Sequence, residues 1–430
     1  MKREKPELFQ STTAHQTDGM AQARAAPQDR AEPVRLSIDG QLIRLLLKSM
    51  GEPPVRVRLW NGDVLMPSSG EAVGGIHITS RASLLKLVVD PAFQFGECYC
   101  DGSIAVDGDM VGLLEVLIRG LSDNASTARQ MIDWSRRRRA NTLAASRDNI
   151  HSHYDLGNAF YELWLDRELA YTCAYFPTPE STLEEAQIAK MDHVCRKLRL
   201  RPGETVVEAG CGWGALALHM ATHFGVEVKA FNISREQLAY ARARARAQGV
   251  ESRVEFIEDD YRNISGRFDA FVSVGMLEHV GPENYQELGR VIDRVLAPDG
   301  RGLIHSIGLV RPAPLNAWIE KRIFPGAYPP SLREMLEVLE PPGFSVLDVE
   351  NLRLHYALTL KHWLERFENA KSQVSEMYDE RFVRAWRVYL CGSQAAFNTG
   401  QMQLFQVLFA RQNTNKVPWT RAHLYDPAAN

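Results

Sequence analysis

The sequence predicts an α/β protein in which a doubly wound parallel sheet follows a smaller α+β domain. Three observations support this prediction. Short apolar runs alternate with amphipathic helical segments after about residue 151, a glycine-rich turn joins one such run to a helix, and the region before residue 121 alternates apolar and polar residues. The 430 residues suffice for two domains and at least one large core.

Changes in composition divide the chain into five segments. We expect a disordered tail at 1–34, a small N-terminal domain at 35–121, a basic linker at 122–150, the main domain at 151–420 and a second tail at 421–430.

The small domain shows strand and turn patterns. Residues 55–59 and 76–78 alternate as strands do, and Asn61, Gly62 and Asp63 predict a hairpin turn between neighbouring strands. Residues 111–121 predict a short helix.

The main domain alternates predicted strands with predicted helices. Helical spacing is clearest at 285–296, where apolar side chains recur every three or four positions before Pro298. Such β and α units imply a parallel sheet with right-handed crossovers. The strands are predicted at 205–208, 226–231, 254–257, 270–274 and 302–307.

The composition restricts partners and location. A net charge of −3 gives no global field for nucleic acid. The six cysteines form no C-x-x-C pair, which favours reduced thiols in a cytoplasm and no metal site. Residues 1–34 lack the apolar segment of a signal peptide. The uncharged stretch 388–410 contains five Asn or Gln residues, so we interpret it as a buried helix pair rather than a membrane span.

The strongest motif, Val-Val-Glu-Ala-Gly-Cys-Gly-Trp-Gly, lies between a predicted strand and a predicted helix. Its glycines let the backbone turn sharply and approach a ligand. A dinucleotide fingerprint would be spaced G-x-G-x-x-G, whereas the spacing here is E-x-G-x-G-x-G, which is typical of S-adenosylmethionine methyltransferases. The residues that we expect to bind this cofactor are Glu208, Gly210, Gly212, Trp213 and Gly214.

Two later strand ends supply further cofactor candidates. The strand after the glycine motif ends without the acidic residue that commonly binds ribose, which leaves Asn232 and Gln237 as polar contacts. Asp260 and Tyr261 follow the third strand, where a carboxylate and an aromatic ring could hold adenine.

Six further segments carry a combined pattern that is more specific than the glycine turn. They are His-Tyr-Asp-Leu-Gly-Asn at 153–158, Tyr-Thr-Cys-Ala-Tyr-Phe at 171–176, Val-Ser-Val-Gly-Met-Leu-Glu-His-Val-Gly at 272–281, Leu-Ile-His-Ser-Ile-Gly at 303–308, Ile-Phe-Pro-Gly at 323–326 and Tyr-Ala-Leu-Thr-Leu at 356–360. Together they resemble the cyclopropane fatty acid synthases and mycolic acid methyltransferases over about residues 150 to 420. Residues 95–102 resemble, less distinctively, the N-terminal lipid-handling module of the longer synthases.

The resemblance implies a Rossmann-like class I methyltransferase that acts on cis double bonds of unsaturated phospholipid acyl chains. In this family an alkene attacks the methyl group of S-adenosylmethionine, and bound bicarbonate removes a proton from the new methyl group so that the ring closes. It also implies a cytoplasmic protein that contacts the inner face of the membrane peripherally. The oligomeric state is left open, with a homodimer as one option.

The resemblance also assigns residue roles. Carried over to this sequence, Cys173 (through its backbone), Glu278, His305 and Tyr356 would hold bicarbonate. Each has an ordinary alternative: a buried thiol, a solvated loop carboxylate, a core histidine and a packed ring. Tyr171 and Thr172 would line the cofactor, while Trp318, Phe324, Trp363 and Phe367 would belong either to the core or to the wall of an acyl channel.

One position departs from the family pattern. A cysteine near the C-terminal helices corresponds to Ser393 here, with Cys391 two residues earlier. Serine keeps a small polar group but removes the thiol, which argues against an obligatory nucleophile at this position. Ser393 stays a catalytic candidate, and the difference leaves open whether the reaction stops at the cyclopropane.

Three other functions remain open on the sequence. A related enzyme makes methyl-branched or methylene fatty acyl chains from the same cation. A small-molecule O- or N-methyltransferase would need neither bicarbonate nor a lipid-handling domain. A non-catalytic lipid-binding protein would not consume S-adenosylmethionine.

The run from Arg136 to Arg139 is either a solvated helix face or a contact for anionic headgroups. Each basic residue at such a surface contributes about 1 kcal/mol. We predict that changing all four to Gln weakens binding to anionic vesicles, more at low salt than at high salt, because salt screens exposed charges. Co-sedimentation measures the binding, and a salt-independent result would remove the headgroup role.

Overall fold

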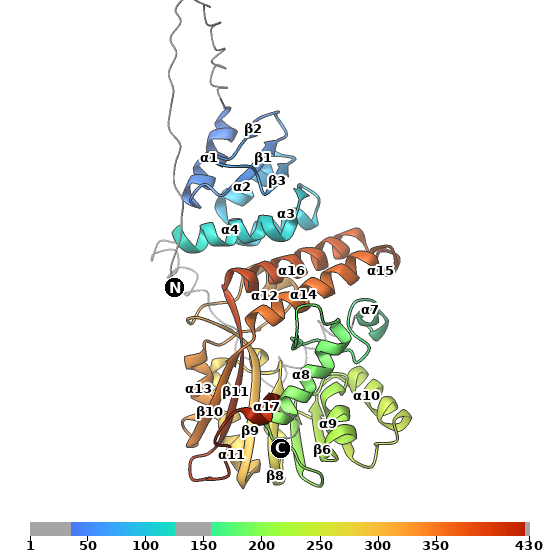
Figure 1. Ribbon diagram of the computed structural model, residues 1–430. Helices are drawn as coiled ribbons and strands as arrows, with labels where there is room; N and C mark the ends of the chain where they lie inside the picture. The colour runs from blue at the N-terminus through green and yellow to red at the C-terminus, as the bar shows by residue number, and fades with distance from the viewer. Residues whose placement is uncertain (1–35, 125–155, 426–430) are drawn as a thin grey trace, which may run out of the picture. The chain divides into compact units, whose positions relative to one another are not determined.

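The computed structural model describes residues 36–124 and 156–425 (Figure 1). The described residues from Ser37 onward belong to one compact unit. The tail predicted at 1–34, the arginine run, most of the predicted linker and the first half of the 153–158 motif therefore lie outside the described residues.

The first part of the chain forms a four-stranded sheet of order β2-β1-β3-β4. The turn at Asn61–Asp63 joins β1 to β2, and the Asp63 N–H donates to Asn61 Oδ1 at 3.1 Å. The predicted strand at 76–78 lies in β3, which pairs with the other side of β1 in parallel. The predicted helix at 111–121 is α4. The elements are α1 (Ile38–Ser49), β1 (Val55–Leu59), β2 (Val64–Leu65), β3 (Gly74–Ile78), α2 (Arg81–Val89), α3 (Pro91–Cys100), β4 (Ile104–Gly108) and α4 (Met110–Asn124).

The second part forms a seven-stranded sheet of order β10-β11-β9-β8-β5-β6-β7. All five predicted strands are present as β5 to β9, and they pair in parallel. The strands are β5 (Thr205–Ala209), β6 (Glu227–Asn232), β7 (Val254–Glu258), β8 (Phe268–Val274), β9 (Leu296–Leu309), β10 (Phe344–Asn351) and β11 (Met402–Arg411).

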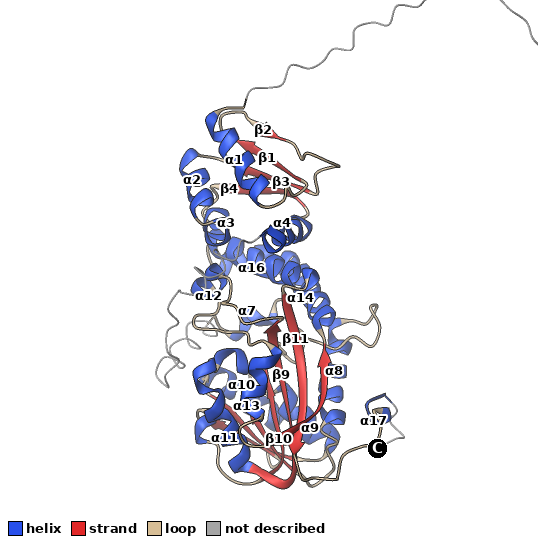
Figure 2. Ribbon diagram, turned by 90° about the vertical axis from the view of Figure 1, so that its left-hand side faces the viewer, coloured by secondary structure: helices blue, strands red, loops and turns tan. Residues whose placement is uncertain are grey.

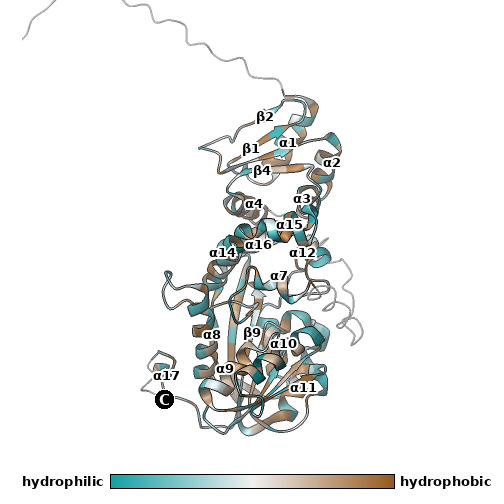
Figure 3. Cartoon of the chain, turned by 90° about the vertical axis from the view of Figure 1, so that its right-hand side faces the viewer, coloured by the Kyte–Doolittle hydropathy of each residue, from teal (hydrophilic) through white to brown (hydrophobic). Residues whose placement is uncertain are grey.

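Helices cover both faces of this sheet, with α8 and α9 on the opposite side from α11 and α13 (Figure 2). Each has one apolar face toward the strands, and Figure 3 shows both hydrophilic and hydrophobic colours along the helices. The predicted helix at 285–296 is α11. The helices are α7 (Asn158–Glu162), α8 (Leu183–Lys197), α9 (Ala215–Phe224), α10 (Arg235–Ala247), α11 (Tyr285–Val295), α12 (Ala317–Arg322), α13 (Leu332–Leu339), α14 (Arg353–Asn369), α15 (Lys371–Met377), α16 (Glu380–Thr399) and α17 (Ala422–Tyr425), with 3-10 turns η1 (Tyr261–Asn263), η2 (Leu277–His279) and η3 (Pro282–Asn284).

The interpretation of 388–410 as a helix pair is wrong. Helix α16 ends at Gly400, whose φ of 80° stops the helix, and the chain returns as strand β11. β11 lies between β9 and β10 and is antiparallel to both, so the sheet is mixed rather than parallel. A strand that is buried on both faces reads as a continuous apolar run, which periodicity does not distinguish from a buried helix.

Two further findings concern the ends and the membrane. The predicted tail at 421–430 is wrong for its first residues, because α17 buries His423 and Leu424 and contacts α8. Among the described helices, none combines the length and apolarity that crossing a bilayer requires.

Helix α3 attaches the first part of the chain to α12. Any Cβ at Gly96 would lie 2.6 Å from the Trp318 ring, so only glycine allows this approach. The Glu97 carboxylate accepts hydrogen bonds from Trp318 Nε1 at 3.0 Å and from Arg322 Nε at 2.8 Å. Gly96 and Glu97, within the segment 95–102, therefore join α3 of the first part of the chain to α12 of the second part.

Helix α8 attaches to the edge strand β10 through buried charges. The Glu350 carboxylate lies 2.7 Å from both His193 Nε2 and Lys197 Nζ. Burial alone would raise the pKa of Glu350, but the hydrogen bond with His193 and the charge of Lys197 outweigh it and lower the pKa to about 2. The carboxylate is thus ionised in the folded protein well into acid.

We predict that Glu350→Gln lowers the free energy of unfolding near neutral pH and makes this free energy less dependent on pH in the acid range. The folded pKa is lower than the ordinary value, so the stabilisation is complete above about pH 4.5 and is lost as the pH falls towards 2. The difference between these pKa values corresponds to about 3 kcal/mol. Urea unfolding measured from neutral to acid pH tests this, with the exposed Glu337→Gln on α13 as the control. Equal acid sensitivity of wild type and Glu350→Gln would contradict it.

Candidate functional site

The site lies where the strand order of the large sheet reverses. From β5 the chain continues to β6 on one side, while β8 pairs with β5 on the other side. In open α/β sheets the loops at the carboxyl ends of two such strands enclose a crevice. The glycine loop after β5 and the η2 turn after β8 meet there, because a Cβ at Gly210 would lie 3.0 Å from Met276 Cβ.

The glycine loop has the backbone that close approach to a ligand requires. Gly214 has a φ of 81°, and a Cβ there would lie 2.8 Å from the Phe256 ring, so its glycine is needed for packing. Gly212 has a φ of 53°, and a Cβ there would meet no protein atom within 4 Å. Gly212 therefore borders open space. Helix α9, which follows, has no side-chain cap at its N-terminus.

Asn232 and Gln237 lie beside this loop, where they brace it. Asn232 Nδ2 donates to the Gly212 carbonyl at 3.2 Å and to Gln237 Oε1 at 2.8 Å. Asn232 Oδ1 accepts from the backbone N–H groups of Ile233 and Ser234. These two predicted cofactor contacts thus bind each other and the backbone of the glycine loop.

Asp260 and Tyr261 carry an interaction that the sequence analysis did not anticipate. The Asp260 carboxylate accepts from Arg262 Nη1 at 3.1 Å, and the Arg262 guanidinium lies 4.8 Å from the centre of the Tyr261 ring. The Arg262 guanidinium therefore already binds the Asp260 carboxylate and lies over the Tyr261 ring, which are the two groups that we expected to hold adenine.

Glu208 and Trp213 are both buried. Glu208 Oε2 has no hydrogen-bond partner in the described part of the chain, and burial raises the pKa of this carboxyl to about 8 despite the nearby Lys190. Trp213 Nε1 donates to Asn158 Oδ1 at 2.7 Å, and its ring packs 4.9 Å from that of Tyr161. Trp213 thus attaches the loop to α7, while Glu208 is a buried carboxyl at the end of β5 with one oxygen unpartnered among the described residues.

The segment Tyr171–Cys173 is held in place by helix α8. Gln187 Nε2 donates to the carbonyl of Thr172 at 2.9 Å, and Lys190 Nζ donates to Thr172 Oγ1 at 2.9 Å. Tyr171 Oη lies 2.8 Å from Tyr389 Oη. Sequence reasoning missed Gln187 and Lys190, whose Gln-x-x-Lys spacing on one helix face carried no motif that we interpreted.

A cavity of about 1300 Å³ opens beside this segment. It brings together seven predicted site residues, namely Tyr171, Thr172, Cys173, Glu278, His305, Tyr356 and Ser393. It also extends into the first part of the chain, where Leu47, Ile78 and Leu114 contribute to its apolar wall. Trp318 and Phe324 line it, whereas Trp363 and Phe367 lie in the hydrophobic core.

Glu278 lies on η2 and faces the cavity. Its Oε1 accepts from the backbone N–H of Ile307 on β9 at 2.5 Å, while Oε2 has no partner within the described ranges. Burial raises the pKa of this carboxyl to about 7. Glu278 thus presents a buried carboxyl oxygen that gains or loses a proton near neutral pH.

His305 lies within β9 and also faces the cavity. Its Nδ1 is 3.1 Å from Gln406 Nε2 on β11, and Nε2 has no hydrogen-bond partner among the residues described. Burial lowers the pKa of His305 well below its usual value, so the ring is neutral. Gln406 escaped sequence reasoning because the strand that carries it was interpreted as a helix.

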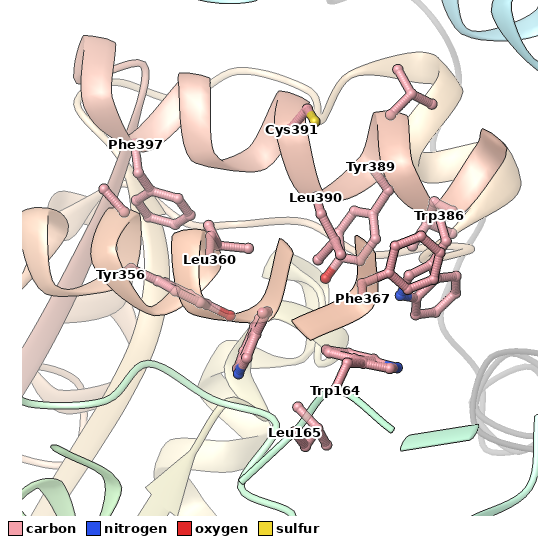
Figure 4. Packing of buried hydrophobic residues seen from close by; sticks show 14 of the residues in the cluster. Trp164, Leu165, Tyr356, Leu360, Phe367, Trp386, Tyr389, Leu390, Cys391 and Phe397 are labelled. Carbon is pink, nitrogen blue, oxygen red and sulfur yellow. The ribbon is translucent and has the colours of Figure 1, made fainter. Parts of the chain in front are cut away.

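The other three candidates come from separate elements. Burial raises the pKa of the Cys173 thiol far above its ordinary value, so it stays protonated. Tyr356 lies on helix α14 and packs 4.5 Å from the Phe397 ring, so it lines the cavity from a helix. In Figure 4, Tyr389 on α16 points toward α14 while Cys391 points away. Ser393 lines the cavity, whereas Cys391 lines a separate pocket.

The residues present fit S-adenosylmethionine and a small anion. The space beside Gly212 and the uncapped start of α9 suit a ligand that carries a carboxylate. Glu278 Oε2 and His305 Nε2 are buried polar atoms that need partners, and hydrogencarbonate both accepts and donates hydrogen bonds.

Comparison with known proteins points in the same direction. A family model described as "Mycolic acid cyclopropane synthetase" matches residues 141–407, and one described as "Domain of unknown function (DUF7884)" matches residues 42–128. A "Probable fatty acid methyltransferase" of Pseudomonas putida is 35% identical over 386 residues, which cover 86% of this chain and 96% of the relative. The "Cyclopropane-fatty-acyl-phospholipid synthase" of Escherichia coli K12 is 36% identical over 348 residues, which cover 80% of this chain and 89% of the relative.

A solved structure of the mycolic acid cyclopropane synthase CmaA1, complexed with SAH and CTAB, is also similar. The TM-score is 0.59 at 30% sequence identity, and the match covers 62% of this chain and 98% of that chain. The seven-stranded sheet with helices on both faces is the Rossmann-like fold of class I S-adenosylmethionine-dependent methyltransferases, to which this similar structure belongs.

We predict that Gly212→Ala abolishes detectable binding of S-adenosylmethionine, because the methyl group would occupy the space beside the loop. The positive φ also strains alanine by about 1–2 kcal/mol. Gly249→Ala is the matched control, since Gly249 has a φ of 66° and is likewise free of protein atoms within 4 Å. Calorimetric titration measures the affinity. Normal affinity in Gly212→Ala would refute the placement of the cofactor at this loop.

Proposed function

This chain belongs to the mycolic acid cyclopropane synthetase family of S-adenosylmethionine-dependent methyltransferases, and we propose that it converts cis double bonds of unsaturated phospholipid acyl chains into cyclopropanes. The observation that carries the proposal is the cavity, which joins an apolar channel to two buried polar atoms without partners in the described chain, Glu278 Oε2 and His305 Nε2. An acyl chain suits the channel, and an anion suits the polar end.

The proposed reaction makes two carbon–carbon bonds. When bound, S-adenosylmethionine supplies an electrophilic methyl group beside the double bond. The π electrons of the alkene form the first bond to that carbon as its bond to sulfur breaks, which leaves a cation on the acyl chain. Loss of one proton from the new methyl group releases the electron pair that forms the second bond and closes the ring.

The chain's own residues would hold the base for this proton. The His305 ring donates from Nε2, and Tyr356 offers a phenol from α14. Glu278 accepts a hydrogen bond from a hydrogencarbonate ion when it is ionised, which its pKa of about 7 allows at neutral pH. We propose bicarbonate as the base, because the buried Cys173 thiol stays protonated and Ser393 has replaced the other cysteine of the family pattern.

The cavity walls would exclude water from the cation. A preorganised anion stabilises a cation most strongly where the dielectric is low. The rings of Trp318 and Phe324 and the aliphatic side chains of the first part of the chain line the channel. This arrangement supports a lipid-handling role for residues 35–121.

Lipid would enter through an exposed apolar rim. Val89 on α2 and Val310 after β9 line the cavity, yet they are 82% and 74% exposed. Large apolar side chains at the mouth of a substrate cavity suit contact with a bilayer surface. We therefore propose peripheral contact with the inner face of the cytoplasmic membrane.

A second candidate function is a fatty acid methyltransferase that makes methyl-branched or methylene chains. The name of the Pseudomonas putida relative favours it, since it is a "Probable fatty acid methyltransferase". Both reactions share the first cation. Loss of a methyl proton from that cation closes the ring, whereas the methylene product needs a 1,2-hydride shift before the methyl group is deprotonated, and a saturated methyl branch needs a reductant in addition. A base already held beside the new methyl group by Glu278 and His305 favours ring closure, because it removes the proton before the hydride shift.

The test uses purified full-length protein, labelled S-adenosylmethionine and vesicles of cis-vaccenoyl phospholipid. We predict label in the lipid and NMR signals of cyclopropane ring protons. Glu278→Gln should lower kcat by about 10²-fold, a typical cost of losing one polar contact to a charged site, with unchanged affinity for S-adenosylmethionine. Glu337→Gln on the exposed face of α13 is the control.

Two outcomes would contradict the proposal. Labelled lipid without ring protons would favour the methyl-branched product, and full activity of Glu278→Gln would remove the base site from the mechanism.

A further inference from the structure

A row of polar residues crosses the large sheet beside the cavity. His305 on β9 lies directly opposite Gln406 on β11, and Gln406 lies opposite Glu350 on β10. Directly opposed residues on neighbouring strands share one face of a sheet. His305 and Gln406 are 1% and 0% exposed, while the Glu350 side chain is 25% exposed. The row therefore runs from the cavity toward the surface.

The first contact of the row determines which nitrogen of His305 carries the proton. Gln406 Nε2 lies 3.1 Å from His305 Nδ1. An amide nitrogen only donates, so with this orientation of the Gln406 amide, whose Oε1 has no partner in the described chain, Nδ1 accepts and a neutral ring has its proton on Nε2. Nε2 is buried and has no hydrogen-bond partner in the described chain, and His305 is among the residues that line the cavity, so that proton is left for a ligand.

The third position of the row, Glu350, holds its carboxylate away from His305. Glu350 is bound by His193 and Lys197, each at 2.7 Å. A carboxylate beside Nδ1 would attract the ring proton to that nitrogen. Adjacent strands lie about 4.8 Å apart, so Gln406 places Glu350 about two strand spacings from the ring.

The charges around His305 keep its ring neutral, so only the position of the ring proton can vary. Helix α8 presents Lys190, His193 and Lys197, and β10 presents Glu350. Burial and the two lysines oppose an imidazolium, while Glu350 favours it only weakly from across Gln406. The ring is therefore neutral, and what its cavity side can do depends on which nitrogen is protonated.

We propose that Gln406 is a positioning residue that holds His305 in the Nε2–H tautomer, so that the ring donates a hydrogen bond to the anion in the cavity. The role of that hydrogen bond rests on the function proposed above. Gln406 does not itself line the cavity and contacts no reacting atom. It acts through His305. An amide has the same size as a carboxylate, but its nitrogen donates a hydrogen bond where a carboxylate oxygen would accept one.

The test compares wild type with Gln406→Glu and Gln406→Met in the full chain labelled with ¹⁵N-histidine. We expect the His305 signal of wild type, identified by its loss in His305→Gln, to report a proton on Nε2. Gln406→Glu should move the proton to Nδ1, because the carboxylate only accepts. Gln406→Met should remove the preference without adding a charge, and it decides the matter if Gln406→Glu does not fold.

The kinetic readout separates this role from plain packing. We expect kcat of Gln406→Glu with cis-vaccenoyl phospholipid to fall about 10²-fold, as when a donor to a catalytic anion is lost. Affinity for S-adenosylmethionine should be unchanged, and Gln406→Met should retain more activity than Gln406→Glu.

Three results would overturn the proposal: a wild-type proton on Nδ1, which would place the amide oxygen against the ring; the same tautomer in Gln406→Met and wild type; or a changed tautomer with unchanged kcat. If wild type methylates no lipid, the function proposed above fails, and the spectra still decide whether Gln406 sets the tautomer.

Discussion

Burial of ionisable groups at the carboxyl edge of the sheet is the constraint on which this structure depends. Taking Glu278 and His305 out of water raises the pKa of the first and lowers that of the second. Both groups then sit in a wall that is otherwise largely apolar, so each is stable only with a polar partner. The surrounding elements supply part of that partnership, through the Ile307 N–H and the Gln406 amide, and leave one atom of each group without a partner among the described residues.

The fold explains why several distant segments converge on this wall. The strand order reverses between β5 and β8, which places the glycine loop beside η2. Helix α8 then holds Tyr171–Cys173 through Gln187 and Lys190, and α14 and α16 close the cavity from the other side. The glycine loop and the cavity share the segment around Gly275, which lines the cavity and packs against Thr172.

Sequence reasoning succeeded where the signal was local. The strands β5 to β9 and helix α11 were predictable because apolar periodicity and glycine spacing lie within short windows. It failed at β11, where burial on both faces removes the alternation. It also missed the pairing of His305 with Gln406, because these residues are 101 positions apart in the chain. It missed the pairing of Asp260 with Arg262 because no motif marks this contact. The five catalytic candidates line one cavity, and their roles stay a prediction.

The late position of β11 has a consequence for biosynthesis. The strand that fills the gap between β9 and β10 is synthesised after both of them, although it supplies the neighbour of His305. Until then, β9 has an unpaired edge and β10 has no strand partner in the described sheet, and such edges invite association with other chains. A nascent chain of this protein would depend on chaperones or on rapid completion, and a product cut short before residue 402 would be prone to aggregate rather than merely inactive.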